Sequence, residues 1–326
     1  MEPGQGFLLE PEHGTEDPGA VPLKICSLLP SATEIVFTLG LSDELVGVTH
    51  ECDFPPAAGR LPVVTRSTLR HGTRDSRNIH HHISAALHTG SSVYVLDQEL
   101  LERLDPDLIL TQELCDVCAV SYELVEQAVQ RLKGTRRVLS LEPTSLPGIL
   151  ATIEQVGTVA GVPDRAATLV AELRRRIAAV AEKAAKATRR PRVFVMEWLD
   201  PPFTAGHWVP EMVRLAGGLD TLGREGQPSS PITWSRIVEY DPEVTVLIPC
   251  GFTLEQTVEE AAKVHSPEEW GRLTANRGAR VYAVNGSAYF NRPGPRIVDG
   301  LEILAEILHP GLFPPRWQGT AWQQLA

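Results

Sequence analysis

Two short polar segments carry the side chains best suited to chemistry. One is His50-Glu51-Cys52-Asp53, and the other contains the C-x-x-C pair Cys115 and Cys118. Imidazole and thiolate groups are preferred ligands of zinc, and both also ligate cobalt. Because each segment follows an apolar run typical of a buried parallel strand, we expect both at one edge of a sheet. His50, Cys52, Cys115 and Cys118 are therefore candidates for one metal site or reactive cluster.

Alternatives stay open for the cysteines. A C-x-x-C pair also serves as a redox couple, or its two thiols are unrelated. A shared metal requires neighbouring strands, whose ends lie about 5 Å apart. Otherwise Cys115 and Cys118 form a lone pair. Cys26 and Cys250 lie within apolar runs, so we expect them to be inert core thiols.

Aromatic side chains form a second candidate group. Trp198 ends an apolar run, Trp208 and Trp234 stand in Pro- and Ser-bearing loops, and Tyr289 follows another apolar run. Rings gathered at strand ends around one cleft suit a large, flat, partly apolar ligand. The alternative is that each ring fills the interior of its own loop.

Two predicted helices carry polar side chains near their starts. Ser31-Ala32-Thr33-Glu34 follows the first predicted strand and matches a capping box, in which the Ser31 hydroxyl accepts from the Glu34 N–H. A helix start at the carboxyl end of a strand also meets ligands, so Ser31 is a candidate binding residue. Residues 78–87 predict another helix, whose three histidines, 80–82, point in different directions and indicate a solvent-facing surface.

Residues 163–187 predict a long helix that organises the chain. Pro163 suits a first helical turn, Asp164 complements the positive end of the helix dipole, and Pro191 lies beyond the end. The helix would be roughly 37 Å long at 1.5 Å per residue. It is either an ordinary crossover helix or a rigid strut between two lobes. Its apolar stripe comprises Ala166, Leu169, Val170, Leu173, Ile177, Val180, Ala181 and Ala184.

The sequence segments before and after this helix resemble each other. Residues 103–112 and 239–250 both read as a helix end, an Asp-Pro turn, an acidic residue and an apolar run. Residues 136–142 and 279–286 match in the same order. The repeat predicts an α/β protein with two Rossmann-like lobes, mainly parallel sheets and one long rigid joining helix. The expected divisions are a disordered tail 1–21, a lobe 22–145, linking helices 146–190, a second lobe 191–309 and a tail 310–326.

Bulk composition excludes several classes of function. The chain has 326 residues, 43% apolar and 22% charged, which is ordinary for globular domains. A net charge of −11 without a basic cluster argues against a nucleic acid partner. No run approaches the roughly 20 apolar residues of a membrane span. The acidic, Gly- and Pro-rich start lacks the basic segment and apolar core of a signal peptide, so we expect a cytoplasmic protein.

Several motifs together resemble a known family. SLLPSATEIVFTLGL, VGVTHECDFP, DLILTQELCDVC and SAYFNRPGPRIVDGLEILAEILHP are similar to the cobalamin-binding branch of the substrate-binding proteins of ABC importers. This branch has the helical-backbone, Fe/cobalamin periplasmic-binding-protein type of fold, and relatives carry haem and iron siderophores. The resemblance implies a non-enzymatic carrier or scavenger that holds a corrinoid between two lobes and is linked to cobalamin uptake.

The resemblance also assigns roles to residues. A corrin ring would stack on Trp208, Trp234 and Tyr289, and His50 or Cys52 would ligate its cobalt. Glu99 and Glu211 match the acidic residues that dock on ABC transporter subunits. The alternatives are a zinc- or thiol-dependent protein built on the His50 cluster, and haem or iron-chelate binding on the same fold. The candidate ligand-binding residues are Ser31, His50, Glu51, Cys52, Trp198, Trp208, Trp234, Tyr289 and Arg292.

Overall fold

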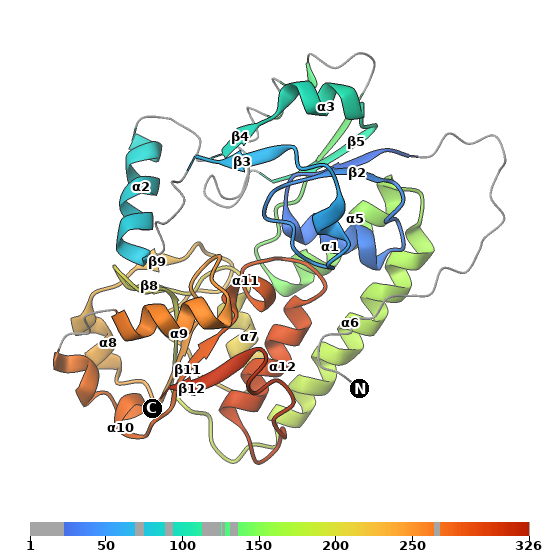
Figure 1. Ribbon diagram of the computed structural model, residues 1–326. Coiled ribbons are helices and arrows are strands. Elements are labelled where there is room, and N and C mark those ends of the chain that lie inside the picture. Colours follow the sequence, from blue (N-terminus) through green and yellow to red (C-terminus); the bar gives the residue numbers. More distant parts are fainter. Residues whose placement is uncertain are drawn as a thin grey trace.

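Two α/β lobes lie side by side and are joined by one long helix (Figure 1). The computed structural model describes residues 23–68, 75–88, 94–112, 125, 128–130, 136–263 and 268–325. The expected disordered tail 1–21 and the Cys115–Cys118 pair lie outside these residues. The predicted fold class, two lobes with mainly parallel sheets and a long connecting helix, is confirmed.

The first lobe is built on a parallel sheet whose described strands stand in the order β2-β1-β5-β6. Its central strands are almost fully buried, as uninterrupted apolar runs predict. A small antiparallel pair, β3 with β4, lies beside it. The strands are β1 (Ile25–Ser27), β2 (Leu45–Val48), β3 (Thr65–Ser67), β4 (Tyr94–Leu96), β5 (Leu108–Thr111) and β6 (Arg137–Ser140). The helices are α1 (Pro30–Thr38), η1 (Ala58–Arg60), α2 (Ser76–His88), α3 (Gln98–Leu104) and α5 (Leu146–Val159).

The second lobe has a sheet whose described strands stand in the order β12-β11-β10-β7-β8-β9. The three central strands are parallel, and the added strands on both sides are antiparallel. The strands are β7 (Val193–Trp198), β8 (Phe203–Thr204), β9 (Ser230–Pro231), β10 (Val244–Leu247), β11 (Val281–Val284) and β12 (Trp322–Leu325). The helices are α7 (Val209–Leu215), α8 (Trp234–Tyr240), α9 (Leu254–Lys263), η2 (Glu268–Arg272), α10 (Thr274–Arg277), α11 (Gly286–Tyr289) and α12 (Ile297–Leu308).

The internal repeat is visible in the geometry of both lobes. Strands β1, β5 and β6 are adjacent in that order, and β7, β10 and β11 repeat it. In each lobe an aspartate before proline, Asp105 or Asp241, ends a helix in the left-handed conformation. Two residues later an acidic side chain accepts a backbone N–H 3.0 Å away, just before the first strand. These pairs are Lys24 N–H with Asp107 and Arg192 N–H with Glu243. The same turn therefore leads from a helix into β5 in the first lobe and into β10 in the second.

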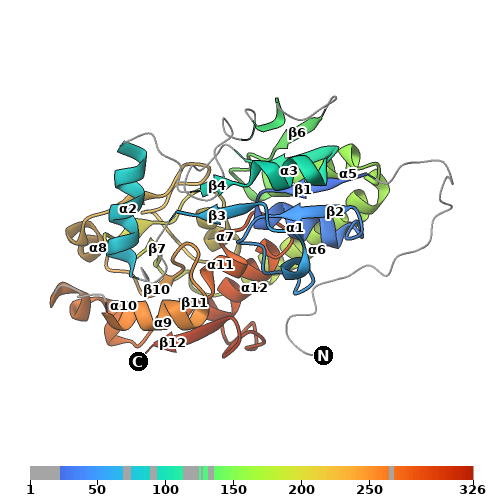
Figure 2. The ribbon, with the colours of Figure 1, turned by 45° about the horizontal axis from the view of Figure 1, so that its top comes forward.

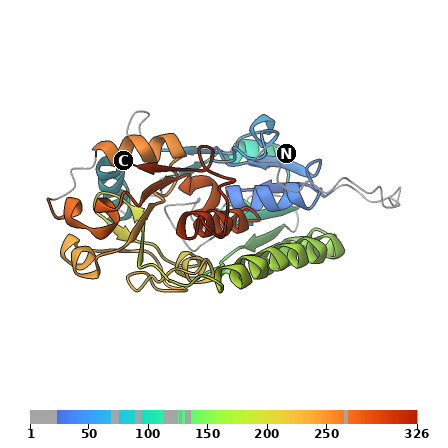
Figure 3. The same ribbon diagram turned by 90° about the horizontal axis from the view of Figure 1, so that it is seen from below.

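The long helix is α6 (Pro163–Ala184), which ends three residues earlier than predicted. Its buried positions are Ala166, Leu169, Val170, Leu173, Val180 and Ala184, all from the predicted stripe. It packs against α5 beside the first lobe and against α12 and α7 in the second. Figure 3 shows α6 alongside α12. The two helices α5 and α6 approach closely at Gly157, where an added Cβ would lie 2.3 Å from the Cβ of Ala166.

Residues 310–326, which the sequence analysis sets apart as a tail, contribute to the second lobe. They supply β12, which pairs antiparallel with β11. Trp317 and Trp322 are buried, and the Glu306 carboxylate accepts from the Trp317 N–H and the Trp322 indole N–H. In the part of the chain that the structure describes, no helix has the length and apolar character needed to cross a bilayer.

Candidate functional site

A cavity of about 240 Å³ opens between the lobes. Its walls come from the segments that follow the parallel strands, which is where open α/β sheets bind ligands. The first lobe contributes Ser31 after β1, Glu51 after β2 and Gln112 after β5. The second lobe contributes Trp198 at the end of β7 and Cys250 after β10. Further lining residues are Tyr94, Phe252, Ser287, Asn291 and Arg292.

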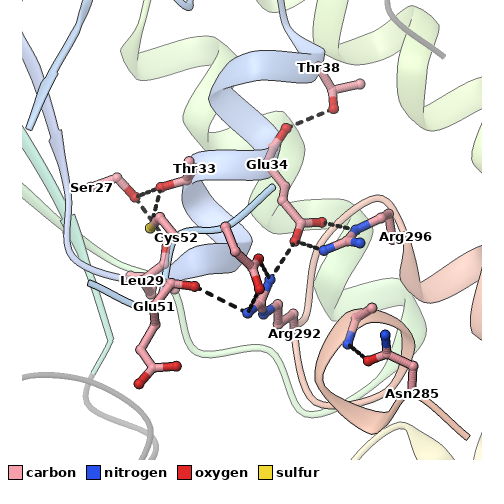
Figure 4. Close-up of polar contacts among 12 residues, drawn as sticks. Ser27, Leu29, Thr33, Glu34, Thr38, Glu51, Cys52, Asn285, Arg292 and Arg296 are labelled. Atoms are coloured by element: carbon pink, nitrogen blue, oxygen red, sulfur yellow. Dashed lines mark hydrogen bonds and ion pairs between the residues drawn. The ribbon is translucent and has the colours of Figure 1, made fainter. Parts of the chain in front are cut away.

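Ion pairs connect the two lobes, and one of their members, Arg292, lines this cleft (Figure 4). Arg296, just before α12, donates to both carboxylate oxygens of Glu34 in α1, at 2.5 and 2.9 Å. Arg292 pairs with Asp53 and donates to the Glu51 carbonyl oxygen at 3.1 Å. Glu34 is only 2% exposed, and Arg292 Nη1 lies 3.6 Å from Glu34 Oε1. We call these four charged side chains, Glu34, Asp53, Arg292 and Arg296, the interlobe clamp.

The predicted capping box is wrong. Helix α1 begins at Pro30, so Leu29 is the N-cap residue and no side chain caps the helix. Ser31 is thereby inside the first turn, and Glu34 turns away from the helix start to reach Arg296. Proline at the first helical position is favoured, because its missing N–H costs nothing there. Ser31 does line the cleft.

His50 and Cys52 are not among the described residues that line the cavity. Cys52 is 5% exposed, and its sulfur lies 3.0 Å from the Thr33 hydroxyl. Burial raises the pKa of the Cys52 thiol to about 11, so it is protonated at neutral pH. His50 Nδ1 lies 2.7 Å from the Thr65 hydroxyl. Its Nε2 lies 3.3 Å from Glu51, and this contact lowers the pKa of the Glu51 carboxyl.

The described residues give no support for zinc. None of their His, Cys, Asp and Glu side chains gather in groups of three or more that could hold a metal ion. A protonated, buried thiol is a poor metal ligand, because the thiolate is the ligating form. The other half of the predicted cluster, Cys115 and Cys118, lies outside the described residues.

Cys250 differs from its prediction as an inert core thiol. It is only partly buried and stands on the second-lobe wall of the cavity. Its position one residue beyond a buried apolar run explains the error, because strand β10 ends at Leu247 and the chain then turns into the cleft. Cys26 is fully buried, and burial raises the pKa of its thiol to about 12.

The predicted aromatic group does not converge on one cleft. Trp198 lines the cavity, and its ring meets Phe252 edge-on with centroids 5.7 Å apart. Trp208 is a core residue whose indole N–H donates to the Phe290 carbonyl oxygen at 2.8 Å. Trp234 packs on Trp270 in a separate pocket of about 280 Å³. Tyr289 borders a third pocket of about 590 Å³ beside α6.

Several cleft residues could not be found from the sequence. Tyr94 and Phe252 are single aromatic residues beside polar loops, without a pattern to distinguish them. Ile79 and Ile83 are one turn apart on α2, and this spacing marks an apolar ridge but not its partner. That ridge faces the cleft, while His81 and His82 of the predicted solvent-facing surface are exposed. His80 also contacts the second lobe, with its ring centroid 5.9 Å from that of Phe203.

The two predicted docking residues have different surroundings. Glu99 is exposed in the first turn of α3. Glu211, in the first turn of α7, accepts from the Leu146 N–H at 2.9 Å and so caps α5. Its side chain is 16% exposed. This placement favours an intramolecular role for Glu211.

Comparison with known proteins identifies related chains. A cobalamin-binding protein of Halobacterium salinarum is 27% identical over 294 residues, covering 88% of this chain and 70% of that protein. An uncharacterised substrate-binding lipoprotein of an ABC transporter from Bacillus subtilis is 26% identical over 299 residues, covering 90% and 82%. A periplasmic haem-binding protein from Pseudomonas aeruginosa has a similar structure, with a TM-score of 0.70, 20% identity, and coverage of 94% and 99%. At that identity the structural likeness shows the fold alone.

The family model described as "Periplasmic binding protein" matches residues 25–288. The expectation of a cytoplasmic protein is wrong, because the matched family is periplasmic and its relatives include a lipoprotein. The family consists of non-catalytic substrate-binding proteins of ABC transporters. This chain therefore belongs to the periplasmic binding protein family and binds a ligand as the substrate-binding protein of an ABC transporter.

Proposed function

We propose that the ligand is a corrinoid, a cobalamin-like molecule held between the lobes and delivered to an ABC transporter. The observation that carries this proposal is the charge of the cleft. Among the described lining residues, Arg292 is the one cation and Glu51 the one acid. Arg292 already pairs with Asp53 and lies 3.6 Å from Glu34. No uncommitted cation in this lining is left to neutralise the carboxylates of haem or an acidic iron chelate.

Neutral polar groups in the cleft suit a corrin better. Gln112 and Asn291 offer amides, and Ser31 and Ser287 offer hydroxyls, which are donors and acceptors for the amide-bearing rim of a corrin ring. Asn291 Oδ1 is buried and lacks a hydrogen-bond partner among the described residues. An unpaired buried acceptor costs free energy, so a ligand amide N–H would be favoured there.

Aromatic side chains complete the wall of the cleft. Trp198 and Phe252 present an edge-on pair, and Tyr94 faces the same cavity. Such rings stack on the apolar faces of a large flat ligand. The cobalamin-binding relative from Halobacterium salinarum supports the same ligand class.

Spectroscopic and calorimetric titration tests the proposal. Purified protein would be titrated separately with cyanocobalamin, haemin and a ferric siderophore. We expect one site per chain for cyanocobalamin and weaker or no binding of the two anionic ligands, because their carboxylates or catecholates would be buried unpaired. Saturable binding of haemin or the iron chelate, with no heat and no spectral change for any cobalamin, would overturn the proposal.

Two tryptophan variants test which of two pockets the ligand occupies. Trp198→Ala removes a ring from the cleft, whereas Trp234→Ala removes one from the separate pocket. We expect Trp198→Ala to weaken cyanocobalamin binding roughly tenfold or more, as for a buried aromatic contact. Trp234→Ala should leave the affinity unchanged. Equal effects of the two variants would show that the ligand does not occupy the interlobe cleft.

A further inference from the structure

Helix α2 belongs to the first lobe by sequence but packs on the second lobe. Figures 1 and 2 show it apart from α1 and α3, next to the β8 region. Arg77 forms an ion pair with Asp200 at 2.7 Å, and His80 contacts the ring of Phe203. The helix is therefore attached to the second lobe, and its Ile79 and Ile83 line the cleft.

The first residue of α2 is anchored by a buried carboxylate of the second lobe. Glu260 in α9 is 3% exposed, and Ser76 is fully buried. Glu260 Oε1 accepts from the Ser76 N–H at 2.6 Å and from the Ser76 hydroxyl at 2.5 Å. Bonds to a charged acceptor are stronger than neutral ones, and a carboxylate complements the positive end of a helix. We call this contact the Ser76–Glu260 latch.

The latch is connected directly to the ligand cavity. The indole N–H of Trp198, which lines the cavity, donates to the Ser76 carbonyl oxygen at 3.2 Å. On the next turns of α2, Ile79 and Ile83 form part of the cavity wall. Ser76 thus links Trp198 to the helix that carries Ile79 and Ile83.

The cavity is too small for a corrinoid while α2 stays in place. Its volume of about 240 Å³ is below the roughly 300–1,000 Å³ of sites for drug-sized ligands, and a corrinoid is larger than those. The interlobe clamp and α6 hold the lobes together. Movement of α2 is the change that enlarges the cavity without breaking buried ion pairs.

We propose that Glu260 is a positioning residue that holds α2 over the empty cleft, so that ligand entry requires release of the Ser76–Glu260 latch. This inference rests on the proposed corrinoid function for its binding readout. Loss of the latch raises the fraction of molecules with an open cleft, and the apparent association rate and affinity rise with that fraction.

The test compares wild type, Glu260→Gln and the milder Ser76→Ala. Stopped-flow absorbance with cyanocobalamin should show an association rate about tenfold higher in Glu260→Gln, because a charge-assisted bond is weakened. Hydrogen–deuterium exchange of α2 amides in the ligand-free protein should be faster in both variants. Glu306→Gln is the matched control, since Glu306 is a buried carboxylate that also accepts two hydrogen bonds, here from two N–H groups, but lies within one lobe. It should change neither readout.

The outcomes separate the latch from the ligand assignment. Unchanged α2 exchange in both latch variants overturns the latch, as does an equal change in Glu306→Gln. Faster α2 exchange with unaltered cyanocobalamin association also overturns the requirement for release. If wild-type protein binds no cobalamin, the corrinoid assignment fails, and the exchange comparison alone then decides whether Glu260 holds α2.

Discussion

At the scale of single residues, buried carboxyl groups in this protein differ in their partners. Glu34 has two guanidinium groups beside it. Among the described residues, Asp220 has only backbone donors, because its Oδ1 accepts from the N–H groups of Leu222 and Gly223, both at 2.9 Å. Burial without a cation raises the pKa of Asp220 from 3.8 to about 6. Stability should therefore depend on pH through this residue.

We predict that Asp220→Asn stabilises the protein above pH 6. The folded protein binds the proton of the Asp220 carboxyl more tightly than the unfolded chain does. The contribution of this group to the free energy of unfolding is therefore present at pH 4 and is lost as the pH rises through 6. Asparagine keeps the acceptor and removes the buried charge, so the free energy of unfolding should rise by about 1–3 kcal/mol at pH 7.5 and match wild type near pH 4. Urea denaturation at both pH values measures this. Asp43→Asn, at an exposed position, should follow the wild-type profile. A less stable Asp220→Asn at pH 7.5 would contradict the prediction.

At the scale of elements, the close packing of α5 on α6 depends on a missing side chain. Gly157 has no Cβ, and this lets the backbone of α5 approach Ala166. Both helices border the first lobe, and Glu211 ties the start of α5 to α7 in the second lobe. The position of the long helix is thus set by small side chains as much as by its apolar stripe.

Exchanging the small residues between these helices tests the contact. Gly157→Ala should destabilise the protein by about 1–3 kcal/mol, because the two Cβ atoms would overlap. Adding Ala166→Gly removes one of them and should recover most of the loss, apart from about 1 kcal/mol of helix propensity. A double-mutant cycle from chemical denaturation gives the coupling. Strictly additive effects would show that the helices do not touch at this point.

How far the sequence predicts these elements depends on the range of the interaction. Leu169, Val170 and Leu173 reveal α6 by spacing alone, because helix periodicity is local. The Asp-Pro turns predict the repeat for the same reason. In contrast, Ser76 and Glu260 are 184 residues apart, so no local pattern links α2 to the second lobe. Trp198 and Trp234 both stand at element ends, and only tertiary packing decides that one lines the cleft.

At the scale of the whole molecule, the lobes are held by α6, by the interlobe clamp and by α2. The clamp is the buried part of this arrangement, with Glu34 and Arg292 both under 10% exposed. Removing one partner of a buried ion pair leaves a charge without compensation. The relative orientation of the lobes should therefore depend on the clamp, and ligand binding should change the overall shape little.

We predict that Arg296→Ala costs about 3–5 kcal/mol of unfolding free energy, because Glu34 loses both of its short bonds. Small-angle scattering should also show a larger radius of gyration than wild type. Arg214→Ala is the control, since Arg214 makes an exposed two-bond pair with Glu225 within one lobe and should cost at most about 1 kcal/mol. Similar losses in both variants would contradict a special role for the clamp.

The second sheet is also protected from self-association at its edges. Without β12, the apolar strand β11 would expose a row of unpaired N–H and C=O groups, which is a template for strands of other copies. β12 covers that row and presents Gln323 and Gln324 to solvent. Within the described residues, the opposite edge is β9, which is two residues long and contains Pro231, a residue that cannot donate. Within the described residues, both edges of this sheet are thus short strands, β12 of four residues and β9 of two, which limits strand addition by other copies.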